Sequence, residues 1–287
     1  MYKIVKKEKL VEDIDRFYIK APLIARKAKA GQFVVIRINE DGERIPLTIA
    51  GYNRSNGIIS IVSMRVGKTT SLLSSLKEGD SILDVVGPLG NASEIENFGR
   101  VICVGGGVGI PPIFPIAREL KKIGNYVISI IGARSKDLLI LKEEMEDTSD
   151  ELYICSDDGS IGYHGFVSDF LKEYLEKNLT GNADKRKDIA RVIAIGPALM
   201  MSAVADVTRP FNIKTIVSLN SIMVDGTGMC GACRVEVGGK TKFVCVNGPE
   251  FDGHQVNFEL LLSRQKIYCD QEKECMDIYE HKCMLDK

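Results

Sequence analysis

The chain has 287 residues, of which 45% are hydrophobic and 27% charged, and its formal net charge is -1. This length exceeds the usual size of one hydrophobic core and predicts two domains with a small appendage. A near-neutral charge gives no electrostatic footprint for nucleic acid or an anionic membrane, so we expect neither as a partner. The N-terminus shows no apolar signal region and no apolar run is long enough to span a bilayer, which predicts a cytoplasmic protein.

Residues 1–97 have the pattern of a β-rich domain. Short β-branched segments are bounded by Gly, Asn or Asp at the spacing typical of a small barrel, and we expect strands at 32–38, 45–50, 57–63 and 81–86. One helix is predicted from about Thr70 to Lys77, with Thr69 or Thr70 placed to cap it. We therefore expect an antiparallel β-barrel.

Residues 98–217 alternate between strand and helix patterns. Strands are predicted at 100–104, 126–131, 151–155, 191–195 and near 215–217, and helices at 113–122, 136–146, 166–177 and 197–207. A polar linker covers 179–188. This alternation predicts a doubly wound parallel sheet with its ligand crevice beyond the carboxyl ends of the strands. Residues 218–287 form a small third module followed by a charged tail that is helical or partly ordered.

Four residues of the third module have the spacing of iron–sulfur ligands. A 2Fe-2S site of plant type has the pattern C-x4-C-x2-C with a distant fourth Cys. Here Asp225 stands in the first position, Cys230 and Cys233 follow, and Cys245 closes the next hairpin. Three glycines in the loop allow the backbone to curl around a small inorganic core and to direct N-H groups at sulfide: Gly226, Gly228 and Gly231.

Two other interpretations of these cysteines remain open. A structural zinc site usually pairs two short Cys or His knuckles, whereas this chain has one knuckle and a single distant Cys. Buried, unreactive thiols are the other alternative. Eight cysteines in an intracellular chain favour metal ligands over a disulfide framework, so the iron–sulfur interpretation is preferred.

A glycine-rich turn follows the first strand of the second domain and opens its first helix. Glycine backbone can approach a pyrophosphate closely, and the free N-H groups of a helix start favour an anion. Ile110 occupies the last glycine position of the dinucleotide fingerprint G-x-G-x-x-G, so the motif is incomplete and a purely structural turn stays open. The candidate nucleotide-binding residues are Gly105, Gly106, Gly107 and Gly109.

The loops after the next two strands carry further nucleotide candidates. The acidic residue that would bond the ribose of NAD is absent after the second strand, where Arg134 stands instead; it reads equally as a contact to the 2′-phosphate of NADP and as an exposed arginine. Asp157 and Asp158 follow the third strand. They can bond ribose or nicotinamide groups, or they can cap a helix or stabilise a turn.

The first domain carries a second set of nucleotide candidates. Arg44, Pro46, Leu47 and Thr48 lie along one predicted strand, where the arginine can grip a pyrophosphate and the threonine hydroxyl can lie near the polar edge of a flavin ring. A predicted helix start nearby is another anion site and contains Gly67, Lys68, Thr69 and Thr70. Two phosphate-compatible loops on separate domains predict two different nucleotides.

These motifs together resemble the ferredoxin-NADP reductase superfamily. The resemblance covers nearly the whole chain and is carried by R-x-P-x-T, by G-K-x-T before a helix, by G-P-L-G at 87–90, by the glycine-rich turn, and by G-P-x-x-M-M at 196–201. It implies FAD on the barrel and NAD(P) on the α/β domain. The appended module is similar to that of two kinds of electron-transfer subunit, from dihydroorotate dehydrogenase B and from NADH-dependent reduced ferredoxin:NADP+ oxidoreductase.

Asp225 favours the second kind, which resembles this chain in having Asp plus three Cys and in the runs 224–230 and 248–254. That resemblance implies NAD(H), FAD and a 2Fe-2S cluster in this chain. It also implies a large partner subunit, similar to the glutamate synthase small subunit, that carries a second FAD, two 4Fe-4S clusters and the NADPH site, with ferredoxin as an indirect partner. It selects NADH over the open interpretation of Arg134.

The expected chemistry is electron transfer by an oxidoreductase subunit. NADH gives two electrons as a hydride and a 2Fe-2S cluster accepts one at a time, so a flavin must lie between them. Thr48 and Gly196 are assigned positioning roles, and Gly196 with Pro197 permits close approach of the nicotinamide. No acid–base pair is apparent, and the three histidines are expected to be structural or exposed: His164, His254 and His281.

Two functional alternatives remain: the electron-transfer subunit of dihydroorotate dehydrogenase B, and a non-enzymatic nucleotide-responsive module with structural zinc. Among the other cysteines, Cys103 and Cys155 are expected to be buried hydrophobes. The tail cysteines read either as exposed thiols or as a further metal site completed by a partner: Cys269, Cys275 and Cys283. Met200 and Met201 line the nicotinamide pocket by resemblance, or fill the core.

Overall fold

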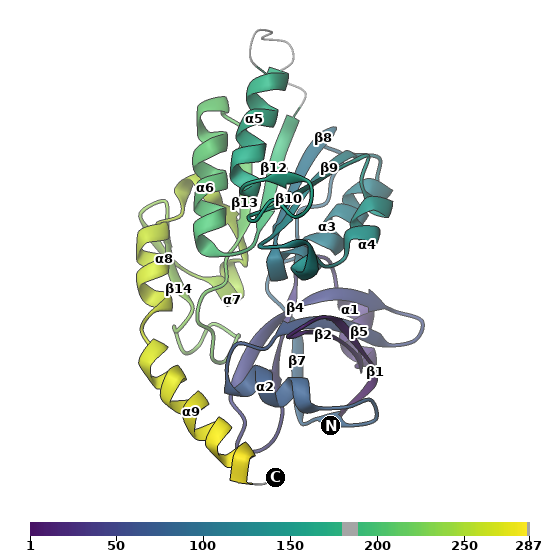
Figure 1. Ribbon diagram of the computed structural model, residues 1–287, viewed down its shortest axis with the longest axis vertical. Coiled ribbons are helices and arrows are strands. Elements are labelled where there is room, and N and C mark those ends of the chain that lie inside the picture. The colour runs from purple at the N-terminus through teal and green to yellow at the C-terminus, as the bar shows by residue number, and fades with distance from the viewer. Residues whose placement is uncertain (180–188, 286–287) are drawn as a thin grey trace.

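The computed structural model of the protein describes residues 1–179 and 189–285, apart from the side chains of 280 and 282–285. Most of the predicted linker, 180–188, and the side chain of Cys283 therefore lie outside the described residues. A β-barrel, an α/β domain and a C-terminal module pack together, with the barrel at the bottom of Figure 1 and the α/β domain above it. The expected fold class is confirmed.

The barrel is a seven-stranded sheet in which every neighbouring pair is antiparallel. Its order is β6 (Ser81–Ile82), β1 (Tyr2–Val11), β2 (Ile14–Lys20), β5 (Ile58–Met64), β4 (Arg44–Asn53), β3 (Phe33–Arg37) and β7 (Asp84–Leu89). Two helices accompany it rather than the one predicted: α1 (Pro22–Lys27), which begins with a proline suited to the first helical turn, and α2 (Lys68–Ser75). The helix α2 begins two residues earlier than predicted.

The α/β domain has a mostly parallel seven-stranded sheet. The order is β11 (Tyr163–His164), β10 (Glu151–Ser156), β9 (Tyr126–Ala133), β8 (Arg100–Gly106), β12 (Ile189–Ile195), β13 (Lys214–Ser218) and β16 (Glu250–Asp252). Only β16 runs antiparallel, and it comes from the C-terminal module. The helices are α3 (Ile110–Lys122), α4 (Lys142–Thr148), α5 (Val167–Leu179) and α6 (Ala198–Thr208).

Both faces of this sheet are covered, as a doubly wound fold requires. In β8, Val101 and Cys103 pack with α3, whereas Ile102 and Val104 alternate to the opposite face and pack with α5 and α6. The predicted helix 136–146 is wrong in part. A 3-10 turn, Lys136–Leu138, is followed by Leu139, Ile140 and Leu141, which pack into the core and interrupt the helix before α4 begins.

The C-terminal module contains β14 (Arg234–Val237), β15 (Lys240–Phe243), α7 (Val244–Asn247), α8 (Phe258–Gln265) and α9 (Cys269–Leu285). Its apolar side chains join the core of the α/β domain and also contact Phe33 and Val35 of the barrel. The last helix, α9, runs down beside the barrel and packs against α2 (Figure 1). The module thus contacts both larger domains.

Candidate functional site: a cluster loop beside two nucleotide loops

Two of the predicted cluster ligands are brought together by the hairpin that separates them. The thiols of Cys233 and Cys245 are buried, and their sulfur atoms lie 3.2 Å apart. The short helix α7 follows β15 directly, and its Cys245 N-H points at the Cys233 sulfur at 3.5 Å. The hairpin β14–β15 therefore returns the fourth predicted ligand to the third.

The other two predicted ligands are joined through the loop backbone. One oxygen of Asp225 accepts the N-H of Cys230 at 2.7 Å, and the other accepts the hydroxyl of Thr227 at 2.7 Å and also the N-H of Thr227. The hydrogen bond from the Thr227 side chain, followed by those from Cys230 and the loop backbone, lowers the pKa of Asp225 below its usual range. The carboxylate is thus ionised and holds the loop from 225 to 230 in shape.

The donor set fits a binuclear cluster better than a single metal ion. Among the side chains that the structure describes, no group of three His, Cys, Asp or Glu residues meets at one point. A 2Fe-2S cluster has two irons with two protein ligands each, which matches one pair made by Asp225 and Cys230 and another made by Cys233 and Cys245. Two thiolates on one tetrahedral ion with metal–sulfur bonds of about 2.3 Å lie roughly 3.8 Å apart. The observed 3.2 Å needs only a small adjustment.

Burial raises the pKa of a thiol in the pair formed by Cys233 and Cys245. Desolvation, followed by the hydrogen bond with Cys233, raises the pKa of the Cys245 thiol to about 12. A thiolate at this place requires a neighbouring positive charge, which a bound metal supplies. Without a metal the buried Cys245 thiol therefore stays protonated, and a metal that binds to this pair must displace its proton.

The cluster loop lies against the edge of the barrel. Gly226 has φ of +77°, and a Cβ there would lie 2.8 Å from Val35 Cγ2 and 2.9 Å from Leu89 Cδ1. Val35 belongs to β3 and Leu89 to β7. Only a glycine permits this close approach of the loop to both strands.

The same face of the barrel carries the candidate flavin residues of β4. Phe33 pairs with Thr48 and Val35 pairs with Pro46, and directly opposed residues of an antiparallel pair share one face. Arg44 and Thr48 therefore lie on the face that the cluster loop contacts. Leu47 alternates to the other face and packs on the barrel core, so its predicted cofactor contact is restricted to its backbone.

The predicted anion loop at the start of α2 is built around threonine hydroxyls. Gly67 is the N-cap, and the Thr70 hydroxyl accepts the Gly67 N-H at 3.1 Å, so Thr70 supports the helix from its third position rather than capping it. The Thr69 hydroxyl donates to Glu43 Oε2 at 2.7 Å. Lys68 is exposed. Sequence reasoning missed Glu43, because nothing in the local pattern shows its contact 26 residues away.

The glycine-rich turn of the α/β domain owes most of its glycines to packing within the protein. A Cβ at Gly109 would lie 2.0 Å from the Ile195 carbonyl oxygen, and one at Gly106 would lie 2.4 Å from Met200 Sδ. Gly105 similarly faces Ile110 and Ile113. Gly107 differs from them, since it has φ of +53° and a Cβ added to it would have no atom within 4 Å. This open position fits close approach of a pyrophosphate.

The turn after β12 lies beside this glycine-rich turn. A Cβ at Gly196 would meet Met200 Cε at 2.7 Å and the Gly106 carbonyl oxygen at 3.3 Å. Pro197 is the N-cap of α6. Met200 therefore lies over both turns, whereas Met201 is fully buried in the core, so the two methionines that the sequence left undecided have different environments.

The loops after β9 and β10 are tied to each other. The Lys136 N-H donates to the Ser160 hydroxyl oxygen at 2.8 Å, and Ser160 in turn donates through its own N-H to Asp158 at 2.9 Å. The hydrogen bond from the Ser160 side chain is the main cause that lowers the pKa of Asp158. Asp158 thus stabilises a turn. Asp157 and Arg134 are exposed at the same edge of the sheet, where a nucleotide can reach them.

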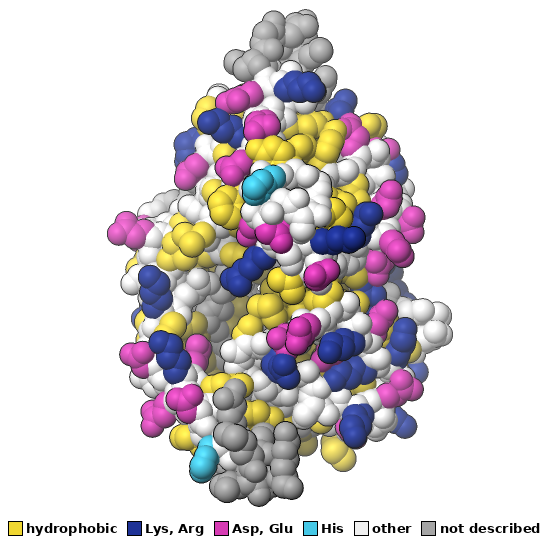
Figure 2. Space-filling model, viewed as in Figure 1, with side chains coloured by type: hydrophobic (Ala, Val, Ile, Leu, Met, Phe, Trp, Pro, Cys, Tyr) yellow, Lys and Arg dark blue, Asp and Glu magenta, His cyan; other side chains and the backbone are white. Residues whose placement is uncertain are grey.

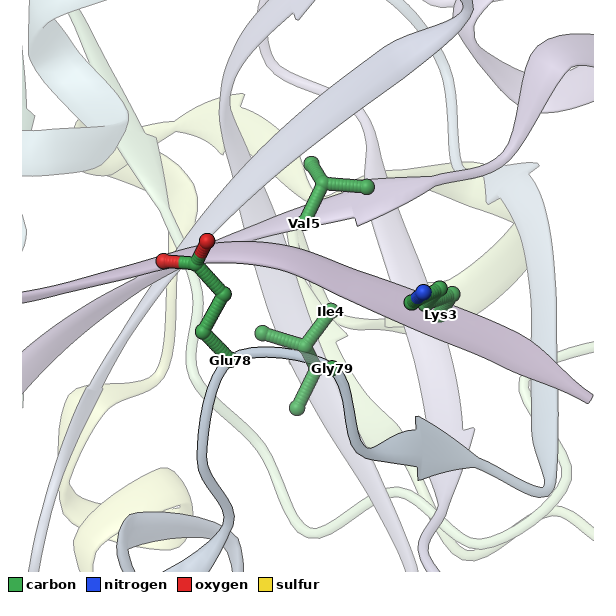
Figure 3. Close-up of a pocket in the computed structure, with 5 residues that line it drawn as sticks. All are labelled: Lys3, Ile4, Val5, Glu78 and Gly79. Atoms are coloured by element: carbon green, nitrogen blue, oxygen red, sulfur yellow. The ribbon is translucent and has the colours of Figure 1, made fainter.

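The surface is hollowed where the barrel, the α/β domain and the C-terminal module meet (Figure 2). A separate open hollow of about 320 Å³ lies at the start of β1 and the turn before β6, lined by Lys3, Ile4, Val5, Glu78 and Gly79 (Figure 3). None of the predicted site residues lines it, so it has no part in the candidate site.

Comparison with known proteins gives matches over most of the chain. A homologue of the dihydroorotate dehydrogenase B (NAD(+)) electron transfer subunit from Thermotoga maritima is 50% identical over 94% of this chain and 92% of the relative. A probable subunit of the same name from Methanocaldococcus jannaschii is 36% identical over 80% and 81%. Residues 220–257 match the iron-sulfur cluster binding domain of dihydroorotate dehydrogenase B. The chain belongs to the family of dihydroorotate dehydrogenase B electron transfer subunits and their homologues.

One solved structure resembles this chain in sequence and fold, and a more distant one resembles it in fold. A chain from the structure of NADH-dependent reduced ferredoxin-NADP oxidoreductase has a TM-score of 0.89 and 47% identity, and the match covers 97% of this chain and 98% of that one. Phthalate dioxygenase reductase shares the fold at a TM-score of 0.58 and 19% identity, over 82% and 85% of the two chains.

Membership of the electron transfer subunit family confirms several expectations. The resemblance to the ferredoxin-NADP reductase superfamily holds, and the chain is an oxidoreductase subunit that uses FAD, NAD(H) and a 2Fe-2S cluster. The residues assigned to each group remain predictions, as do the domain limits. Across the described part of the chain, we find no helix with the length and apolar character needed to cross a bilayer.

Proposed function

We propose that this chain carries electrons from NADH, through FAD on the barrel and a 2Fe-2S cluster in the C-terminal module, to a partner subunit. The complex would be an NADH-dependent ferredoxin:NADP+ transhydrogenase that bifurcates electrons, and its large subunit would carry FAD and 4Fe-4S clusters. The observation that supports this most strongly is the 47% identity over nearly the whole length of a chain from NADH-dependent reduced ferredoxin-NADP oxidoreductase.

The proposal assigns one role to each part of the chain. Residues 1–97 bind FAD, residues 98–217 bind NADH, and residues 218–287 hold the cluster. FAD, when bound, supplies the conversion between a two-electron hydride and single electrons. The chain itself supplies binding and orientation.

Each set of residues has a specific task in this proposal. Arg44 and the first turn of α2 bind phosphate, and Thr48 orients the flavin edge. Gly107 admits a pyrophosphate because no side chain fills the space above it, and Gly196 with Pro197 leaves room for the nicotinamide. Asp225 with Cys230, and Cys233 with Cys245, hold the metal centre.

The geometry of the cluster loop supports the exit route. The loop contacts β3 and β7, and β3 pairs directly with the strand that carries Arg44 and Thr48. The residues of β4 assigned to flavin binding thus lie on the same face of the sheet as the contacts of the cluster loop with β3 and β7. In this proposal the flavin lies along β4, and the cluster loop contacts β3, the strand next to it.

A second candidate is the electron transfer subunit of dihydroorotate dehydrogenase B. It is favoured by the match of residues 220–257 to that enzyme's iron–sulfur domain and by a 30% identical subunit of that name from Fusobacterium nucleatum, covering 87% of this chain and 95% of that relative. The two candidates differ in partner and final acceptor, and Asp225 favours the first.

The test is anaerobic purification from the native organism with its bound partner. We expect flavin bands with broad iron–sulfur absorption, about two irons per chain in this subunit, and NADH-dependent dye reduction by the isolated chain. A partner that produces orotate would favour the second candidate. Colourless protein that contains zinc would exclude both.

A further inference from the structure

A hydrogen bond joins two segments of the barrel that are distant in sequence. The hydroxyl of Thr69 donates to Glu43 Oε2 at 2.7 Å across 26 residues. Thr69 is 8% exposed, whereas Glu43 is exposed. Because a buried hydroxyl needs a partner for its proton and this carboxylate supplies one, the bond constrains both segments.

The bond links two backbone segments that each carry an exposed cationic residue. Glu43 immediately precedes Arg44, the first residue of β4, and Thr69 is the second residue of α2, directly after Lys68. Arg44 and Lys68 are exposed, and neither forms an ion pair with any side chain that the structure describes. By contrast, Arg37, which pairs with Arg44 across the sheet, is neutralised by Asp84 at 2.7 Å.

The resulting donor set has the chemistry of a phosphate site. It combines a guanidinium, an ammonium group and the first-turn N-H groups of an eight-residue helix, which have no partner within the helix itself. Nothing lies within 4 Å of a Cβ built at Gly67, so the approach to the helix start is open. These groups fit the pyrophosphate of FAD, and they come from two segments that need a link.

We propose that Glu43 is the positioning residue that makes one pyrophosphate site out of these two segments. This inference rests on the proposed binding of FAD to the barrel. A carboxylate repels phosphate, so Glu43 acts through Thr69 and not by contact with the ligand. It holds Arg44 beside the start of α2, and it therefore contributes to recognition of the phosphate-bearing part of FAD and not of the flavin ring.

The experiment compares FAD with riboflavin, which has the ring but no phosphate, using the full-length chain after reversible removal of flavin. Dissociation constants are measured by flavin fluorescence. Glu43→Ala and Thr69→Val each remove the bond, and we expect FAD to bind about tenfold more weakly while riboflavin changes by less than about twofold. The double variant is expected to bind FAD no more weakly than either single variant.

Conservative variants separate the hydrogen bond from the charge. Glu43→Gln keeps an acceptor oxygen and Thr69→Ser keeps the hydroxyl, so both are expected to bind FAD within about threefold of the unchanged chain. Asp41→Asn is the matched control, since Asp41 is an exposed acid of the same turn. It is expected to leave both dissociation constants unchanged.

Three results would overturn the role of Glu43. These are unchanged FAD binding in Glu43→Ala, equal weakening of FAD and riboflavin, and loss of affinity in Glu43→Gln as large as in Glu43→Ala. If the wild-type chain binds neither FAD nor riboflavin, the proposed function is overturned together with this inference. The two failures are therefore distinguishable.

Discussion

The glycine-rich turn of the α/β domain and the cluster loop of the C-terminal module look alike in sequence and differ in physical origin. In the turn, Gly109 is required because the Ile195 carbonyl oxygen would lie 2.0 Å from any Cβ. In the loop, Gly226 has φ of +77°, and Asp225 closes the turn by accepting hydrogen bonds from Thr227 and Cys230. One segment needs glycine for packing against its neighbour, and the other needs it for backbone conformation as well.

This difference changes how a glycine-rich motif should be interpreted. Three of the four candidate glycines in the turn are explained by contacts inside the protein, and only Gly107 faces open space. The number of glycines in such a motif therefore overstates how many positions face a nucleotide. Substituting these glycines with alanine distinguishes the positions that are required by packing from the position that faces a nucleotide.

The largest effect is expected from Gly109→Ala. The added Cβ would overlap backbone atoms of Ile195 and the Gly196 Cα, which cannot rotate away as a side chain can. We expect the free energy of unfolding to fall by about 3 kcal/mol or more, measured by urea denaturation of the cofactor-loaded chain. An unchanged free energy would show that the adjacent turns can separate and that packing does not explain this glycine.

Gly226→Ala is expected to have the next largest effect. A left-handed alanine costs about 1–2 kcal/mol, and the side chains of Val35 and Leu89 must also move, for a total of about 2–3 kcal/mol. The same variant should lose iron more readily, because the loop lifts from the barrel. Urea denaturation and iron content measure the two effects.

Gly239→Ala is a matched control for Gly226→Ala. Gly239 has φ of +71°, lies in the same module, and has no atom within 4 Å of a built Cβ. It should carry the conformational cost alone, and its iron content should stay normal. Equal losses of stability in the two variants would contradict the importance of the contact with the barrel.

The sequence predicts the elements of this fold better than the contacts between them. Runs of β-branched residues predicted β3, β4 and β5 of the barrel and five strands of the α/β sheet, whereas β1, β2, β11 and β16 were not named. The spacing of Cys230 and Cys233 predicted the cluster loop. These signals are local. The interrupted helix before α4 was predicted incorrectly, because the burial of Leu139 to Leu141 in the core depends on their tertiary environment.

The parts that sequence could not predict are long-range. The pairing of β16 with β13 joins the C-terminal module to the α/β sheet, and the bond from Thr69 to Glu43 joins two barrel segments. Neither contact has a signal in residue type or periodicity. The two environments of Met200 and Met201 likewise depend on which turn each side chain reaches in the folded chain.

Asp225 provides a test of the cluster loop, the second of the two regions compared. Asp225→Ala removes the acceptor for the N-H of Cys230 and the hydroxyl of Thr227, and we expect a loss of stability of about 1 kcal/mol at this solvent-accessible site together with partial loss of iron. Asp225→Asn keeps one acceptor oxygen, so it should lose less stability and less iron than Asp225→Ala. Denaturation and iron analysis provide the comparison.

Asp225→Cys tests direct ligation. If Asp225 ligates iron, the exchange of an oxygen donor for a sulfur donor should change both the reduced-cluster resonance spectrum and the midpoint potential, because ligand identity sets both. An unchanged spectrum and potential would restrict Asp225 to holding the loop through its hydrogen bonds.

Gly107→Ala should cause a small loss of stability and the most selective loss of binding. Its Cβ meets no protein atom, so only the left-handed conformation costs free energy, about 1–2 kcal/mol. The same Cβ would occupy the space assigned to the pyrophosphate, and we expect NADH to bind about tenfold more weakly with flavin and iron content unchanged. Stopped-flow reduction of the flavin by NADH measures this affinity. If NADH binding is instead unaffected, the turn serves only to pack β8 against β12, and all four of its glycines are structural.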